Sequence, residues 1–223
     1  GRLTEDQLLN VTHPTPGTWS LIVKANDSGS TYPPASYTLR VHRLFATNVV
    51  FDNGSISVTN HPYSTWRYFR IEVPPETLGW DVRLINVFTN GGAPEFSIRR
   101  DFAPSSLGNI GWVLPMNTAS WPTGNQWRAT VDWTGREYNA SGQISEYGRI
   151  LAMGMGRPLE PGTYYIGVIN SGGSTNPMAY TLLSRGIGTN MTIPVTQIAF
   201  DGGSFTTNGL PARQAAYFCL NRP

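Results

Sequence analysis

Charged residues are scarce in this chain of 223 residues. Only 13% are Asp, Glu, Lys or Arg, whereas an average domain carries about 25%. The net charge is +2, from 16 basic and 14 acidic residues, and the basic residues form no dense run. This composition argues against a nucleic-acid surface and against a polybasic membrane anchor.

Cysteine and long apolar runs are also lacking. The single cysteine, Cys219, cannot form a disulfide within the chain, and a zinc site built on cysteines is excluded as well. No stretch reaches 18 consecutive apolar residues, which excludes a transmembrane helix. The sequence contains no convincing amphipathic helix either.

The usual sequence signatures of catalysis are missing. The three histidines are His13, His42 and His61, which precede prolines or follow a predicted strand, and no serine has a Gly-x-Ser-x-Gly setting. Acidic residues that could pair for glycoside hydrolysis are scattered and are expected to be solvated or paired with arginine. We therefore predict that the chain is not an enzyme.

Turn residues and strand patterns dominate instead. The chain has 24 glycines and 17 prolines, and alternating apolar residues separate the turns. A shift of the apolar side near Tyr68 suggests a β-bulge, and residues 103–147 appear irregular. Strands are predicted at Thr18–Lys24, Ser36–Val41, Trp66–Val73, Trp80–Val87, Glu95–Arg99 and 149–155. The predicted fold class is all-β, an antiparallel β-sandwich.

Several sequence elements occur twice at a long offset. Pro16-Gly17-Thr18-Trp19 returns as Pro161-Gly162-Thr163-Tyr164, and Phe51-Asp52-Asn53-Gly54-Ser55 returns as Phe200-Asp201-Gly202-Gly203-Ser204. The offsets are 145 and 149 residues, and a fixed long period indicates tandem domains. We predict a complete domain at 46–187, the C-terminal part of a preceding repeat at 1–45 and the N-terminal part of a following repeat at 188–223.

The run Leu159-Glu160-Pro161-Gly162-Thr163-Tyr164-Tyr165-Ile166-Gly167-Val168, followed by a Gly/Ser loop and Tyr180-Thr181-Leu182, resembles the bacterial pre-peptidase C-terminal (PPC) domain. The resemblance covers one complete copy and two partial ones, and it does not extend to the Trp-rich segment 108–147. It implies a jelly-roll or PPC-like sandwich of about eight strands. It also implies a non-catalytic role beside exported enzymes or in large surface proteins.

Four tryptophans are the best candidates for ligand binding. Their aromatic faces could stack on sugar rings while neighbouring amides and carboxylates bond the hydroxyls. They could equally pack a long loop onto the sandwich or onto a neighbouring domain. Both interpretations stay open for these residues, which are Trp112, Trp121, Trp127 and Trp133.

Asp52 and Asp201 occupy the same position of the repeated Phe-Asp turn. Such a turn suits a left-handed glycine and an Asx hydrogen bond. Alternatively, each aspartate could be a calcium ligand at the edge of a sandwich. No cofactor other than calcium is expected.

The sequence therefore predicts a non-catalytic, extracellular or cell-surface repeat module, a structural spacer or adhesion unit of a large surface or fibre-like protein. The alternative is a carbohydrate-binding or secretion-associated accessory domain of an exported hydrolase. Expected partners are neighbouring repeats or identical chains and, in the alternative, an extracellular polysaccharide; nucleic acid and membrane insertion are not expected. Because both ends fall inside predicted repeats, we expect either a longer parent protein or strand pairing between chains.

Overall fold

The computed structural model describes residues 11, 14–23, 36–41, 43–88, 92–105, 107, 126–128, 136–138, 144–153, 159–172, 175–210 and 216–221. Every regular element among these residues is a β-strand, so the predicted all-β class is confirmed. The same residues contain no helix with the length and apolar character needed to cross a membrane.

Twelve strands follow one another along the described chain. Their bounds are β1 (Ala46–Asn48), β2 (Gly54–His61), β3 (Trp66–Val73), β4 (Gly79–Phe88), β5 (Gly92–Arg100), β6 (Gln126–Arg128), β7 (Arg136–Tyr138), β8 (Ile144–Met153), β9 (Gly162–Gly172), β10 (Met178–Ile187), β11 (Val195–Ala199) and β12 (Tyr217–Asn221).

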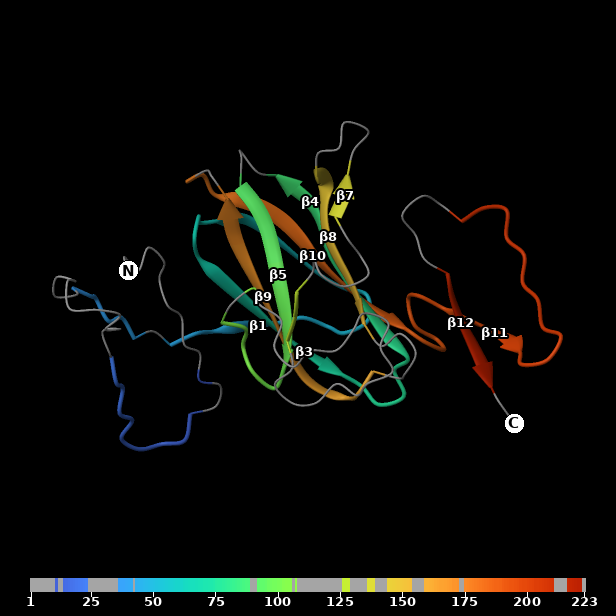
Figure 1. Cartoon of the computed structure of the whole chain (residues 1–223), viewed down its shortest axis with the longest axis horizontal. Coiled ribbons are helices and arrows are strands. Elements are labelled where there is room, and N and C mark those ends of the chain that lie inside the picture. The colour runs from blue at the N-terminus through green and yellow to red at the C-terminus, as the bar shows by residue number, and fades with distance from the viewer. Residues whose placement is uncertain are drawn as a thin grey trace, which may run out of the picture.

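The first ten strands form two five-stranded sheets, which we call the central unit (Figure 1). The first sheet has the order β1-β3-β9-β5-β6, and the second has the order β2-β10-β4-β8-β7. Within these sheets β1 and β3 are parallel, whereas the other strand pairs are antiparallel. A finer jelly-roll or PPC-like classification stays a prediction.

The core lies between the two sheets. Trp80 of β4 meets the edge of Tyr164 of β9, with ring centroids 5.7 Å apart, and Phe69 of β3 meets Tyr180 of β10 at 6.5 Å. Strand side chains alternate between faces, and in β10 Met178, Tyr180 and Leu182 are buried at every second position. The large side chains that are fully buried are Trp80, Tyr164, Tyr180, Phe69, Phe96, Ile71, Leu84, Ile98 and Leu159.

The bulge predicted near Tyr68 is wrong. Pairing of β3 with β9 runs without interruption from Trp66 opposite Ile169 to Val73 opposite Gly162. Tyr68 is buried on the outer face because its ring stacks on Trp66 at 6.0 Å and its hydroxyl donates to the Pro104 carbonyl. Tyr68 is covered on the outer face by its contact with Trp66, and Phe69 is buried in the core. The two consecutive buried residues therefore need no shift of register.

The strands predicted at Thr18–Lys24 and Ser36–Val41 are not observed over 18–23 and 36–41; Lys24 lies outside the described residues. Among the described residues these segments have no neighbouring strand, and a strand is stable only with a hydrogen-bonded partner and a covered face. The segment predicted as irregular, in turn, contains β6, β7 and the start of β8. The pairing of β6 with β5 and of β8 with β4 joins segments far apart in the chain and is not visible in local patterns, and β7 pairs with β8.

The strand pair β11–β12 reproduces the geometry of β1–β3. Both pairs are parallel, and the register of Ala46 opposite Tyr68 returns as Val195 opposite Tyr217, 149 residues later for each partner. The sequence repeat is therefore also a repeat of backbone pairing.

His61 is a buried histidine with both ring nitrogens occupied. Nε2 lies 2.8 Å from the carbonyl oxygen of Thr65, and Nδ1 lies 3.2 Å from the hydroxyl of Tyr180. A neutral ring with the proton on Nε2 donates to Thr65 and accepts from Tyr180. Burial lowers the pKa of His61 below 6.5 against the raising effect of the Thr65 bond, and the positive charge of Arg67 lowers it further.

This burial predicts a loss of stability in mild acid. As the pH falls below about 6.5, histidine in the unfolded chain takes up a proton that native His61 does not, so the free energy of unfolding decreases by up to about 1 kcal/mol per pH unit. Urea unfolding from pH 7.5 to 5.0 measures the effect. The variant His61→Gln should flatten the curve in this window, and an unchanged slope would contradict the assignment.

Candidate functional site

The Asp52 carboxylate binds the segment through which the chain leaves the central unit. One oxygen, Oδ1, accepts hydrogen bonds from the backbone N–H of Gly186 at 2.8 Å and from that of Thr192 at 3.1 Å. The other oxygen accepts from Thr192 N–H at 3.1 Å. We call Asp52, Gly186 and Thr192 the exit clamp. It joins the turn after β1 to the end of β10 and to the residues beyond.

The exit clamp stabilises the ionised form of Asp52. Partial burial of the carboxyl acts to raise its pKa, but hydrogen bonds from the side chain and backbone of Thr192 and from the backbones of Gly186 and Asn53 outweigh this effect. The pKa of Asp52 is therefore below 3.8, because donors that point at a carboxylate favour its charged form.

Residues 188–193, which we call the exit segment, follow β10 and fold back on its end. Gly188 N–H donates to the Ile193 carbonyl at 3.1 Å, and Ile193 N–H donates to Gly186 at 3.0 Å. Met191 packs against the core. A side chain at Gly186 would put its Cβ 2.7 Å from the Met191 sulfur, so glycine permits this contact. The exit segment thus has a defined path.

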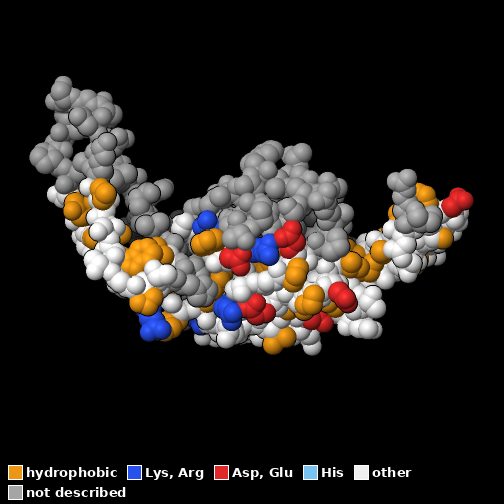
Figure 2. Space-filling view, turned by 90° about the horizontal axis from the view of Figure 1, so that it is seen from below, with side chains coloured by type: hydrophobic (Ala, Val, Ile, Leu, Met, Phe, Trp, Pro, Cys, Tyr) orange, Lys and Arg blue, Asp and Glu red, His pale blue; other side chains and the backbone are white. Residues whose placement is uncertain are grey.

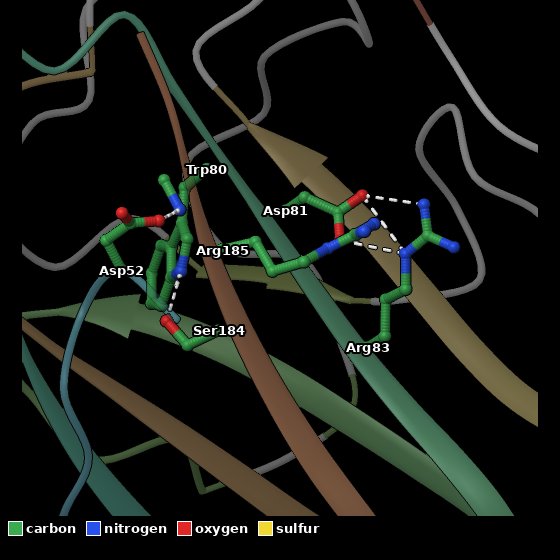
Figure 3. Close-up of polar contacts among 7 residues, drawn as sticks. Asp52, Trp80, Asp81, Arg83, Ser184 and Arg185 are labelled. Carbon is green, nitrogen blue, oxygen red and sulfur yellow. Dashed lines mark hydrogen bonds and ion pairs between the residues drawn. The ribbon is translucent and has the colours of Figure 1, made fainter. Parts of the chain in front are cut away.

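A buried chain of hydrogen bonds supports the clamp from inside (Figure 3). The indole Nε1 of Trp80 donates to Ser184 Oγ at 2.8 Å, and this hydroxyl donates to the Phe51 carbonyl. The bonds link β4, β10 and the turn after β1. Loss of one partner would leave a buried polar group unsatisfied, at a cost of about 1–3 kcal/mol.

A second polar cluster lies on the same two strands (Figure 3). The buried carboxylate of Asp81 accepts from Arg83 Nε at 2.8 Å and from Arg185 Nη2 at 3.0 Å. Tyr217 of β12 is 8% exposed. Burial raises the pKa of Tyr217 to about 12; the charge of Asp81 adds to this, and those of Arg83 and Arg185 oppose it.

The tryptophans are not brought together among the described residues. Trp112, Trp121 and Trp133 lie outside them. Trp127 belongs to β6, where its backbone pairs opposite Ile98 of β5 at an edge of the first sheet. The carbohydrate platform therefore stays a prediction.

The two aspartates occupy the same turn but have different surroundings. Asn53 and Gly202 both have a left-handed backbone, with φ of 57° and 70°. Asp52 faces N–H donors, which repel a cation, and exposed Asp201 accepts no hydrogen bond in the described part of the chain. No three His, Cys, Asp or Glu residues within that part could hold a metal together, and calcium takes six to eight oxygens. Calcium at Asp52 and at Asp201 therefore stays a prediction.

Sequence reasoning missed most of the clamp. Asp52 was found through the repeat, but its clamp partners Gly186 and Thr192 had no signal of their own. The supporting residues Ser184 and Met191 had none either. Trp80 and Ser184 are 104 residues apart, and Asp52 and Thr192 are 140 residues apart. Only the folded arrangement brings them together.

Removal of the clamp carboxylate should destabilise the protein. At neutral pH we expect Asp52→Ala to lower the free energy of unfolding by about 1–2 kcal/mol, because hydrogen bonds to a charged acceptor are lost. The matched variant Asp201→Ala should change it by less than about 0.5 kcal/mol. Because the folded pKa is lowered, the contribution of Asp52 is present above pH 3.8 and is lost as the pH falls through the folded pKa. Urea unfolding at pH 7 and pH 3 checks both statements, and equal effects of the two variants would contradict them.

Comparison with known proteins identifies no family. No protein-family model matches the chain, and no curated protein matches it. Among solved structures it is similar to CorA, a surface-associated copper-binding protein important in copper acquisition in Methylomicrobium album BG8. The identity is 15%, the match covers 62% of this chain and 97% of CorA, and the TM-score is 0.33. A similarity of this size says nothing about what this chain binds.

Proposed function

We propose that the central unit is a non-catalytic spacer module of a repetitive extracellular or cell-surface protein, in which units of similar shape follow one another along the chain. In such an array each unit has its own core, and contacts between neighbours set spacing and stiffness. The exit clamp is the device that sets the direction from one unit to the next.

The repeated strand pair is the observation that carries this proposal. The β11–β12 pair has the parallel register of β1–β3, and the turn between the members of each pair has the same left-handed position. The two turns also share a close backbone contact that only glycine permits. A Cβ at Gly54 would lie 1.9 Å from the Val50 carbonyl oxygen, and a Cβ at Gly203 would lie 2.3 Å from that of Ala199. A second unit of the same design beginning after Pro194 accounts for all three features.

The path of the chain suits a spacer. The described segment before β1 and the β11–β12 pair project from opposite ends of the central unit (Figure 1). The exit segment is tied to the core by Asp52 and Met191. A force applied to one end of the chain is therefore transmitted through the two sheets to the other end.

The chemistry of the described residues supports a role without catalysis. His61, the one histidine that the structure describes, is buried with both nitrogens occupied. Asp81 is paired with two arginines, and Ser184 is buried within the Trp80–Phe51 chain. These polar groups stabilise the fold and are not available to a substrate.

Single-molecule stretching of the full chain from its two ends tests the proposal. A mechanical spacer should unfold in one discrete event, with a contour-length gain of about 500 Å for residues 46–187 at roughly 3.5 Å per residue. The variant Asp52→Ala should lower the unfolding force, and Asp201→Ala should not.

Gradual extension without a discrete event would contradict a spacer. A polysaccharide array provides the second arm of the test. Binding that is lost when Trp112, Trp121, Trp127 and Trp133 are replaced by alanine would favour the carbohydrate-binding alternative and overturn the proposal.

A further inference from the structure

Apolar side chains are exposed on both segments that flank the central unit (Figure 2). Trp19 and Leu21 are 56% and 55% exposed on the N-terminal side. Phe218 and Leu220 of β12 are 44% and 59% exposed on the C-terminal side. Alternate apolar residues exposed on a strand-like segment indicate a face that is covered in the assembled protein.

The central unit shows what covers the equivalent faces. There β3 pairs with β9, with Phe69 opposite Ile166 and Ile71 opposite Tyr164, and all four side chains are fully buried. The strand β12 is equivalent to β3 at an offset of 149 residues, and segment 18–23 is equivalent to part of β9 at an offset of 145. Among the described residues β12 pairs with β11 alone, so within this part of the chain nothing pairs with the edge of β12 that corresponds to the β9-facing edge of β3.

The N-terminal segment already has part of the geometry of β9. Gly17 has φ of 143°, and its equivalent Gly162 has φ of 138°. Both glycines precede the threonine that begins the apolar alternation. The turn that would start the strand is thus preserved, although no strand pairs with 18–23 among the described residues.

We propose that β12 of one copy pairs antiparallel with Thr18–Val23 of a second copy. The register of β3 with β9 then places Phe218 opposite Leu21 and Leu220 opposite Trp19. The two segments lie at opposite ends of the central unit (Figure 1), so a single copy cannot bring them together. The contact is heterologous, and it joins copies head to tail into open chains or rings. The inference rests on the proposed function, since it names the partner of the spacer.

A second strand pair supports the same arrangement. In the other sheet β10 pairs with β2, with Leu182 opposite Ile56. The corresponding residues of the flanks are Leu39 and Phe205, which are both exposed. One docking event therefore covers apolar side chains in both layers.

The single cysteine reports on this register. Cys219 is equivalent to Arg70, which lies opposite Tyr165 in the central unit, so Ser20 of the second copy would lie opposite Cys219. The carbonyl of Arg70 accepts from Val49 beside β1, so its backbone groups face away from β9. Such non-hydrogen-bonded pairs have Cα atoms about 4.5 Å apart, which a disulfide can span.

The experiment is oxidative cross-linking of the full chain with the variant Ser20→Cys. Wild type has one cysteine and can give nothing larger than a disulfide dimer. With a cysteine at each end, Ser20→Cys should give a ladder of dimers, trimers and higher species on a non-reducing gel. Thr18→Cys is the matched control: it is two positions along the same face, where the distance to Cys219 is too long, and its ladder should form at least tenfold more slowly.

Two results would overturn the inference: no species above the dimer for Ser20→Cys, or an equal ladder for Thr18→Cys. Sedimentation velocity of reduced wild type adds a measurement free of cross-links. The mass should rise with concentration, and Leu21→Asp should return it to the monomer; no rise, or no effect of Leu21→Asp, would also overturn the inference. The stretching event of the central unit needs no second copy, so its presence without a ladder would remove this inference alone.

Discussion

Each buried strand of this protein depends on two contacts, a partner strand at its edge and a second sheet across its apolar face. The repeat shows the effect of losing both. Tyr164 and Ile166 are fully buried in β9, whereas the equivalent Trp19 and Leu21 are more than half exposed in a segment that forms no strand. Burial contributes about 25 cal/mol per Å² of apolar surface, and it is this contribution that offsets the entropy of ordering the chain.

The same dependence decides what a polar residue does. Asp52 and Asp201 both follow a phenylalanine in turns of the same shape. Asp52 accepts three hydrogen bonds from two backbone N–H groups, whereas Asp201 accepts none in the described part of the chain. The donors of Asp52 come from the end of β10 and the exit segment of its own unit. Among the described residues Asp201 has no such element near it. The same turn therefore has a structural role only where such donors face it.

Two sets of hydrogen bonds connect the core of the central unit to the chain that leaves it. The Trp80–Ser184–Phe51 chain connects the core to the turn after β1, and the exit clamp connects that turn to the outgoing chain. Hydrogen bonds thus connect the outgoing chain to the close-packed core.

The sequence by itself determined the all-β class, the strands at 66–73, 80–87 and 95–99, the repeat offsets and the importance of the Asp52 turn. These follow from local alternation, turn residues and internal similarity, which are properties of neighbouring residues. Tertiary structure alone decided that Thr18–Val23 forms no strand, that Tyr68 is buried without a bulge, and that Asp52 binds residues 134 and 140 positions away. The physical reason is that strand pairing and burial join residues far apart in the chain. Whether a segment forms a strand therefore depends on partners that its own sequence does not encode.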